Sequence, residues 1–260
     1  MSTGHPNVKV RIRFSKLGKI RFTSHRDVAR MWERALRRAA VPVAYTEGFS
    51  PHPKLSFGLA LSTGHESLGE YLDVDIDGDT AEPVVLEDLP ARLDPGLPIG
   101  LDVQAAAEIA SGTPSLQQAV TSCTWQIEVT GLGEGAELSE RVARCLDATS
   151  LVVTRERKGQ KVTDDLRPAI LSLVAEPDRP LLTAELATQP RGVRPAELVA
   201  LLGDDVAEGR VVRLHQWLSS DGAREEPLPL SPAALSSQPT QRDLFDVRPI
   251  GAARSPVPTG

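Results

Sequence analysis

The chain has 260 residues, of which 40% are hydrophobic and only 4% aromatic, so it can bury a sizeable core that is mainly aliphatic. No stretch approaches the roughly 18 apolar residues of a membrane helix, and the N-terminus has no apolar signal core. We therefore expect neither a membrane span nor export, and a cytoplasmic location. Cys123 and Cys145 fit no metal spacing and are expected to be buried thiols in a reducing compartment.

The net charge of −6 is unevenly distributed. Residues 1–60 carry 12 Lys/Arg and 3 Asp/Glu, a net charge of +9, whereas residues 61–150 carry 3 and 17, a net charge of −14. A basic head favours a surface that faces a polyanion. The alternative is that the basic and acidic segments pair with each other inside the fold. Charge along a sequence does not choose between the two.

The first half predicts one α+β unit. In residues 8–14, apolar residues alternate with Lys9, Arg11 and Arg13, which is typical of a half-buried strand with one basic face. Ser24 and Asp27 have the spacing of a capping box, so a helix is expected from there to about Ala40. Further strands are expected at 41–45, 55–61, 70–76 and 101–106, and a helix at 80–93. The order β-α-β-β-α-β is the ferredoxin-like arrangement.

The predicted helix at 24–40 segregates its side chains. At 100° per residue, five arginines fall within an arc of ~120°. The opposite side carries the apolar residues that would face the core. The five are Arg26, Arg30, Arg34, Arg37 and Arg38.

The second half repeats the same plan with an added hairpin. Strands are expected at 123–130, 168–176, 181–188 and 211–218, helices at 138–147 and 194–202, and a hairpin from 151 to 163. The fold class is therefore α+β, with two ferredoxin-like lobes at 1–110 and 120–218 and a possible pseudo-duplication. No internal repeat in the sequence proves the duplication.

Residues 219–260 are rich in Pro, Ser and Ala and are expected to be a disordered tail. Within the tail, Gln241-Arg242-Asp243-Leu244-Phe245 resembles the short peptide that docks on the bacterial sliding clamp. A pattern of five residues is weakly specific.

Two histidines are the titratable candidates for catalysis. His52 lies between Pro51 and Pro53, which stiffen the backbone on both sides. His25 opens the arginine-rich helix, two residues before Asp27. Together His25, Asp27 and His52 could perform acid–base chemistry. The alternatives are that His25 and Asp27 only cap the helix and that His52 only bonds a nearby carbonyl.

Other chemistries lack their sequence signatures. No metal-binding His or Cys spacing, nucleophile elbow, phosphate-binding loop or dinucleotide fingerprint is present. The chain also has no cysteine triad for an iron–sulfur cluster, so no intrinsic cofactor or metal is expected.

The remaining chemistry is recognition of RNA. Basic side chains would contact phosphates, and Phe22, Tyr45 and Phe49 would stack on unpaired bases. The hairpin charges have a simpler explanation, because Lys and Arg also protect an exposed strand edge from pairing. The predicted nucleic-acid contacts are Arg11, Arg13, Arg30, Arg34, Arg38, Lys54, Arg157, Lys158, Lys161 and Arg167.

Several segments form a specific pattern: Ser24-His25-x-Asp27, Arg30, Glu33-Arg34-Ala35-x-Arg37-Arg38-Ala39, Glu47-Gly48-Phe49-Ser50-Pro51-His52-Pro53-Lys54, Glu66-Ser67-x-Gly69-Glu70-Tyr71-Leu72-Asp73, Lys158-Gly159-x-Lys161 and Asp165-Leu166-Arg167-Pro168. In these segments the chain resembles the radical-SAM-linked protein family. This bacterial domain of unknown function occurs as a separate chain or fused behind a cobalamin-binding radical SAM protein. The resemblance covers roughly residues 8–218.

The resemblance implies a radical SAM partner in trans, which would carry the iron–sulfur cluster, S-adenosylmethionine and cobalamin. Our leading hypothesis is an accessory protein that binds RNA during its modification. The second is an RNA-modifying or RNA-processing enzyme that uses His25 and His52. The third is a protein-interaction module that binds no nucleic acid.

Overall fold

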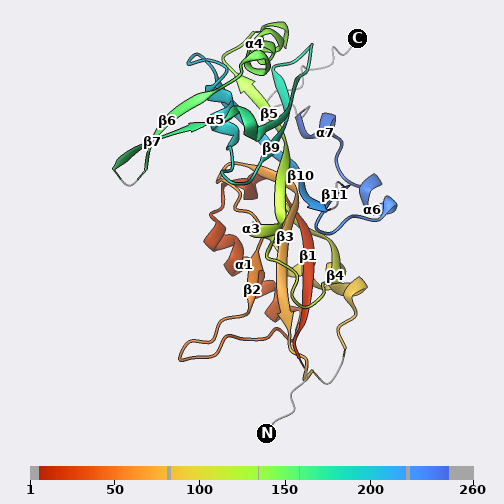
Figure 1. The fold of residues 1–260 in the computed structure, drawn as a ribbon. Coiled ribbons are helices and arrows are strands. Elements are labelled where there is room, and N and C mark those ends of the chain that lie inside the picture. The colour runs from red at the N-terminus through yellow and green to blue at the C-terminus, as the bar shows by residue number, and fades with distance from the viewer. Residues whose placement is uncertain (1–5, 81–82, 134, 158, 221–222, 246–260) are drawn as a thin grey trace, which may run out of the picture. The chain divides into compact units, whose positions relative to one another are not determined.

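The computed structural model describes residues 6–80, 83–133, 135–157, 159–220 and 223–245. The chain divides into two compact units, Met1–Pro229 and Leu230–Gly260. The large unit has a mixed α/β fold around a large, mostly antiparallel sheet (Figure 1).

The first half of the large unit follows the expected order of elements. Its regular elements are β1 (Val8–Lys16), α1 (His25–Arg38), β2 (Leu55–Phe57), β3 (Glu66–Ile76), α2 (Leu89–Leu93) and β4 (Leu101–Glu108), with short 3-10 turns η1 (Gly18–Phe22), η2 (Leu86–Asp88) and η3 (Asp94–Gly96). The expected helix at 80–93 is thus a single turn of α-helix preceded by a 3-10 turn, because Pro83 and Pro90 interrupt the backbone hydrogen bonding. The expected strand at 41–45 is reduced to two isolated bridges, at Val43 and Tyr45.

The second half contains the expected hairpin. Its elements are α3 (Leu116–Ala119), β5 (Val120–Thr130), α4 (Gly135–Asp147), β6 (Val152–Arg157), β7 (Gln160–Asp165), η4 (Arg167–Ala169), β8 (Ile170–Ala175), β9 (Leu181–Ala187), α5 (Pro195–Ala200), β10 (Ala207–Ser220) and β11 (Ala223–Glu225). β6 and β7 pair only with each other and form a separate two-stranded sheet.

The strand order of the large sheet is β4-β1-β3-β10-β5-β9-β8, with β2 added beside β3 and β11 beside β10. In the first half, β1 lies between β4 and β3; in the second half, β5 lies in the same way between β10 and β9. The two halves meet where β10 runs parallel to β3, at Val212↔Glu66 and Arg213↔Ser67. The pseudo-duplication and the lobe limits 1–110 and 120–218 stay predictions, because a shared strand order does not show a common origin.

Two hydrophobic clusters lie along this sheet. One joins α1 and α2 to β1, β3 and β4, and its centre is the edge-on contact of Trp32 with Phe14, whose ring centroids are 4.8 Å apart. The other joins α4 and α5 to the strands of the second half. The apolar stripe predicted for α1 is confirmed, since Val28, Trp32 and Leu36 are buried.

Regular secondary structure continues past residue 219, where the disordered tail was predicted to begin. β10 continues to Ser220, and β11 pairs with it at Leu218↔Glu225, so the expectation of disorder from residue 219 is wrong for this segment. The bonds of the Glu226 carboxylate to Arg13 and to the His215 ring anchor it. In the small unit, α6 (Pro232–Ser236) and α7 (Gln241–Phe245) are capped by Ser231 and Thr240. Residues 246–260 of the predicted tail lie outside the described residues.

Among the described residues, no helix has both the length and the apolar character required to cross a membrane.

A buried ion pair links the two halves, and its loss should be costly. Replacing Glu70 with Ala should lower the free energy of unfolding by about 3–5 kcal/mol, because it leaves the guanidinium of Arg213 buried without its counter-ion. Urea denaturation measures the change.

Glu137→Ala provides a matched control, because Glu137 pairs with Arg141 on α4 and its side chain is 50% exposed. This solvent-exposed pair should contribute far less to the free energy of unfolding than the buried pair. A small loss in both variants would show that the pair between β3 and β10 does not stabilise the sheet.

Candidate nucleic-acid interface

The arginines of α1 lie on the surface as the helical periodicity predicts. Arg26, Arg30, Arg34, Arg37 and Arg38 are all exposed and are called the arginine face below. Two of them have weak local contacts: Arg30 lies 3.4 Å from Asp27, and Nε of Arg34 donates to the carbonyl of Arg30 at 3.2 Å. Exposed contacts of this kind leave guanidinium groups available to a polyanion.

The first turn of α1 is built as a cap. The hydroxyl of Ser24 accepts the amide N–H of Asp27 at 3.2 Å and donates to the Asp27 carboxylate at 2.7 Å. Asp27 is therefore engaged in capping and in the contact with Arg30. The exposed His25 packs edge-on against Phe57, with ring centroids 5.0 Å apart.

His52 lies on a projecting turn, residues 45–53, which we call the Phe49 loop. The loop closes through Thr46, whose N–H donates to the carbonyl of His52 at 2.8 Å and whose hydroxyl accepts the His52 N–H at 3.0 Å. Gly48 takes a φ of 129°, which few other residues tolerate. Phe49 is fully exposed at the tip, and Tyr45 is exposed beside it. The structure thus gives His25 and His52 different neighbours on different elements.

Lys54 follows this loop and is half-buried, with its backbone N–H bonded to the carbonyl of Ala44. It stays at the edge of the exposed loop, as expected. Its predicted contact with phosphate remains a prediction.

Arg11 and Arg13 do not form the exposed basic face that the sequence favours. Arg11 donates two hydrogen bonds to Asp73, at 2.7 and 2.8 Å, and Arg13 is 0% exposed. The alternation along β1 is correct, but both faces of the strand are buried. The predicted phosphate contacts of these two arginines stay predictions that this environment does not favour, because a guanidinium that is enclosed and paired does not reach a ligand at the surface.

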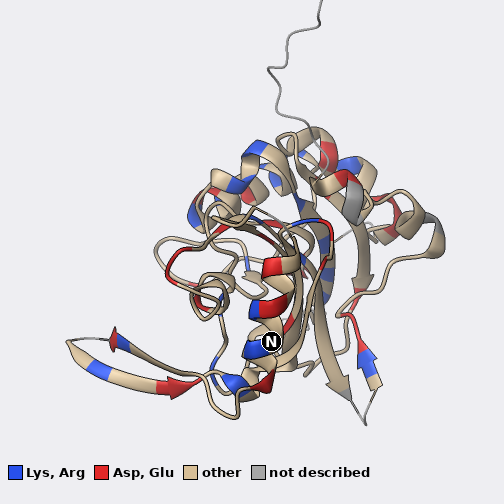
Figure 2. Cartoon of the chain, turned by 90° about the horizontal axis from the view of Figure 1, so that it is seen from above, with Lys and Arg blue, Asp and Glu red and all other residues tan. Residues whose placement is uncertain are grey.

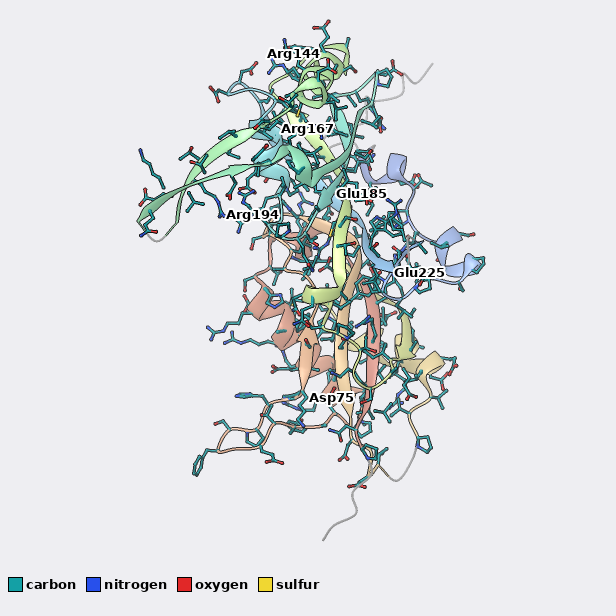
Figure 3. The ribbon with its side chains drawn as sticks, viewed as in Figure 1. Asp75, Arg144, Arg167, Glu185, Arg194 and Glu225 are labelled. Atoms are coloured by element: carbon teal, nitrogen blue, oxygen red, sulfur yellow. The ribbon has the colours of Figure 1, made fainter. Side chains whose placement is uncertain are left out.

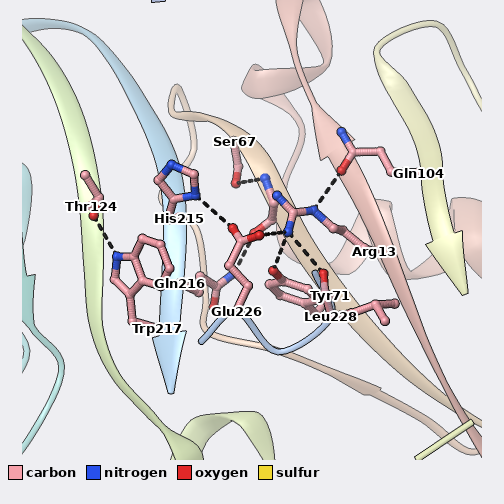
Figure 4. Close-up of polar contacts among 11 residues, drawn as sticks. Arg13, Ser67, Tyr71, Gln104, Thr124, His215, Gln216, Trp217, Glu226 and Leu228 are labelled. Atoms are coloured by element: carbon pink, nitrogen blue, oxygen red, sulfur yellow. Dashed lines mark hydrogen bonds and ion pairs between the residues drawn. The ribbon is translucent and has the colours of Figure 1, made fainter. Parts of the chain in front are cut away.

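The segment after β11 encloses Arg13 (Figure 4). Arg13 bonds the Glu226 carboxylate, the Leu228 carbonyl at 3.1 Å and the Tyr71 hydroxyl at 3.1 Å. Nδ1 of His215 lies 2.8 Å from the same carboxylate. Burial alone would raise the pKa of Glu226, but its bonds to His215 and Arg13 outweigh burial and hold the pKa below its ordinary value.

The β6–β7 hairpin carries charges of both signs (Figure 2). Lys161 is exposed on it. Asp164 bridges two arginines, with Arg155 at 3.1 Å and Arg191 at 2.9 Å. Lys158 and the side chain of Arg157 lie outside the described residues, so their predicted roles are untested.

Arg167, a predicted phosphate contact, instead bonds backbone carbonyls within the fold. Its guanidinium donates to the carbonyls of Leu146, Ala148 and Ile170 at 3.2–3.3 Å. Two of these carbonyls belong to the C-terminal end of α4 and its continuation, where a cation is favourable. The expectation that Arg167 binds phosphate is not supported by these contacts.

The main cavity of the large unit has a volume of about 360 Å³. Its floor consists of neighbouring strands, with Arg213 from β10, Cys123 and Trp125 from β5, and Leu186 from β9. Two connecting segments bound it, 59–62 between β2 and β3 and 192–195 at the start of α5. Neither segment was predicted to belong to a site.

The floor of this cavity contains a buried charge network. Arg213 donates to Glu70 through Nε at 3.1 Å and Nη2 at 2.5 Å, and to the Leu59 carbonyl at 2.9 Å. Burial acts to lower the pKa of Arg213, but the Glu70 carboxylate more than reverses it. Burial raises the pKa of the Cys123 thiol to about 11, so this thiol is protonated at neutral pH.

A second, water-sized cavity of about 20 Å³ adjoins the first. Lys16, His25 and Glu70 line it, and it shares Leu59 and Leu61 with the main cavity. Burial lowers the pKa of Lys16, an effect that Glu70 opposes. Among the described residues, no group of three His, Cys, Asp or Glu side chains has a geometry suited to a metal.

The sequence contains a signal for the charge network of Glu70 and Arg213 that is separate from its apolar periodicity. Glu66 and Glu70 occur in a strand whose other residues are mostly apolar or small, and Arg213 interrupts the apolar run of β10. A charge inside a central strand is rarely left unpaired, so it predicts an opposite charge on a neighbouring strand. Which strand is adjacent depends on the topology.

Comparison with known proteins places the chain in a family. A family model described as an uncharacterized protein conserved in bacteria, DUF2344, matches residues 9–195. None of the curated proteins matches the sequence. The matched region runs from β1 through the arginine face, the Phe49 loop and the β6–β7 hairpin to the start of α5. Because this region is most of the chain, the protein belongs to the bacterial DUF2344 family.

Proposed function

We propose that this protein binds single-stranded regions of RNA through the arginine face and the Phe49 loop, as an accessory to a radical SAM enzyme that modifies the RNA. The observation that carries the proposal is the exposure of all five arginines on one side of α1, in a chain whose net charge is −6. A basic surface retained on an acidic protein favours a polyanionic partner.

The spacing of the arginines suits a phosphate backbone. Arg26, Arg30, Arg34 and Arg38 recur every four residues, which places them about 6 Å apart along the helix axis. Guanidinium groups bind phosphate oxygens in pairs of hydrogen bonds. A row of arginines binds the phosphate backbone of an RNA strand and confers little preference for the RNA sequence.

Exposed aromatic rings supply the other half of the proposed interface. Phe49 projects fully into solvent, and Tyr45 and Phe22 are also exposed. A solvated aromatic ring is unfavourable unless it has a partner, and unpaired bases stack on such rings. In the view of Figure 1, α1, the Phe49 loop and the β6–β7 hairpin all extend to the left of the strands of the large sheet.

The proposed partner follows from the resemblance of the sequence to the radical-SAM-linked family. The iron–sulfur cluster, S-adenosylmethionine and cobalamin would belong to that partner, and this chain would present the RNA. The docking peptide considered for Gln241–Phe245 coincides with α7, and a role for it stays a prediction.

Catalysis at His25 is a second candidate, favoured by its position at the small cavity beside Lys16 and Glu70. Asp27 is less suited to a catalytic role because Ser24 and Arg30 engage its carboxylate. Turnover of RNA by the purified protein that is lost in His25→Ala, with RNA affinity unchanged, would favour this candidate over an accessory role.

Reversing the charge of the arginine face should strongly weaken RNA binding. The variant Arg30→Glu/Arg34→Glu/Arg38→Glu should reduce the slope of log affinity against log salt by about 2, since each lost phosphate contact on a single strand contributes about 0.7. Fluorescence anisotropy with a mixed-sequence single-stranded RNA measures both affinity and slope. Circular dichroism checks that the helix remains folded.

A single variant, Arg34→Glu, is compared with the control Arg144→Glu, because Arg144 is also exposed but lies on α4 (Figure 3). We expect the Arg34 variant to weaken binding and the Arg144 variant to leave it unchanged. Equal effects, or no effect of the triple variant, would contradict a specific role for the arginine face.

The partner can be identified by anaerobic affinity purification from the native bacterium. A protein that contains iron and binds S-adenosylmethionine should co-purify with the tagged chain, and mass spectrometry should identify it as a radical SAM enzyme. Recovery of RNA without any cluster-containing protein, at both low and high salt, would contradict the accessory role.

A further inference from the structure

The main cavity has the architecture of a binding slot. β10, β5 and β9 are consecutive in the sheet, and Arg213 is the register partner of Trp125, as Cys123 is of Leu186. Their side chains therefore form one continuous floor. The segments 59–62 and 192–195 rise on either side, so the space between them is bounded by two walls.

The size and lining of the slot fit one nucleotide. Its volume of about 360 Å³ is at the lower end of the range for small-ligand sites. The walls are mainly apolar, with Leu59, Leu61, Val193 and Pro195, which suits the faces of a planar ring. The hydroxyl-bearing Ser62 and Thr188 lie on the same lining and offer polar groups to a ring edge or a sugar.

The charge of the wall suits an anionic ligand. Arg194 lines the wall and is exposed, whereas Arg213 in the floor is 1% exposed and its charge is matched by Glu70. The Arg213 guanidinium lies 5.4 Å from the centre of the Trp125 ring. Among the described residues that line the slot, none is acidic. Arg213 is held by Glu70 and the Leu59 carbonyl, so the floor is fixed before any ligand enters.

The slot lies next to the elements of the proposed RNA interface. It shares Leu59 and Leu61 with the small cavity at His25, the first residue of α1. On the other side, Asp164 of the β6–β7 hairpin pairs with Arg191, which precedes the wall at 192–195. Figure 3 shows Arg194 between the hairpin and α1.

We propose that this slot binds one nucleotide: a base between the two walls, with its phosphate directed to Arg194. If the protein binds RNA as proposed above, the nucleotide is one residue of the bound RNA, unstacked from its neighbours. This part of the inference rests on the proposed function. A free nucleoside monophosphate has the same chemistry and would occupy the same slot. Unstacking a base of single-stranded RNA costs little, which makes such capture favourable.

The test uses the full chain and a variant that fills the slot. Ala60 is exposed on one wall, so Ala60→Trp should occupy the space without disturbing the core; Ala143→Trp, at an exposed site on α4, is the control. Arg194→Gln removes the wall cation, and Arg144→Gln is its control. Calorimetric titrations use adenosine monophosphate, uridine monophosphate and inorganic phosphate.

We expect both monophosphates to bind, and inorganic phosphate to bind at least about tenfold more weakly, because phosphate alone has no base to stack between the walls. Ala60→Trp should weaken the affinity for both monophosphates at least about tenfold, and Ala143→Trp should leave this affinity unchanged. Absence of monophosphate binding, equal binding of phosphate alone, or no effect of Ala60→Trp would each overturn the proposal.

A second measurement separates RNA from free nucleotide as the source. A fluorescent purine analogue in a single-stranded RNA should brighten on binding to the wild-type chain and not to Ala60→Trp. The variant Arg30→Glu/Arg34→Glu/Arg38→Glu should lose affinity for RNA but keep its affinity for the monophosphates. That pattern supports both proposals. RNA binding without monophosphate binding overturns the slot alone, and monophosphate binding without RNA binding overturns the proposed function alone.

Discussion

Two carboxylates of β3 meet two guanidinium groups of β10, and this pairing is the interaction on which the sheet depends. Glu66 is fully buried and bonds Arg210, while Glu70, four residues later on β3, bonds Arg213. β3 and β10 share only two register pairs, so backbone hydrogen bonds contribute little there. The ion pairs therefore carry much of the connection between the two hydrophobic clusters. They also fix Arg213 in the floor of the main cavity.

The basic residues of positions 1–60 form two groups, one paired within the fold and one exposed, which the composition does not distinguish. On β1, Arg11 pairs with Asp73 and Lys9 lies 3.8 Å from Asp75, so these charges are matched within the fold by the acidic segment that follows. On α1, the five arginines face solvent. Pairing within the fold is thus confirmed for β1, whereas a polyanion facing α1 stays a prediction. The proposed RNA interface uses only the second group.

Periodicity predicted most of the regular elements, because apolar alternation and helical spacing are local properties. The arginine face and the hairpin at 151–163 were found in this way. The cavity was not, because Leu59, Trp125, Val193 and Arg213 are far apart in sequence and meet only through the strand order. The exposure of Arg11 and Arg13 was mistaken for the same reason: the segment that covers them, at Glu226 and beyond, lies more than 200 residues later.

The late position of that segment has a consequence for synthesis. β10 lies in the middle of the sheet, yet it is made after all the other strands of the main sheet except β11. Until it emerges from the ribosome, Glu66 and Glu70 lack their partners Arg210 and Arg213, and Arg13 lacks Glu226 for longer still. The first half is thus complete in its helices and strands well before these charges meet their partners on β10 and at Glu226. A nascent chain at this stage exposes an open sheet edge, which is the kind of surface that chaperones protect.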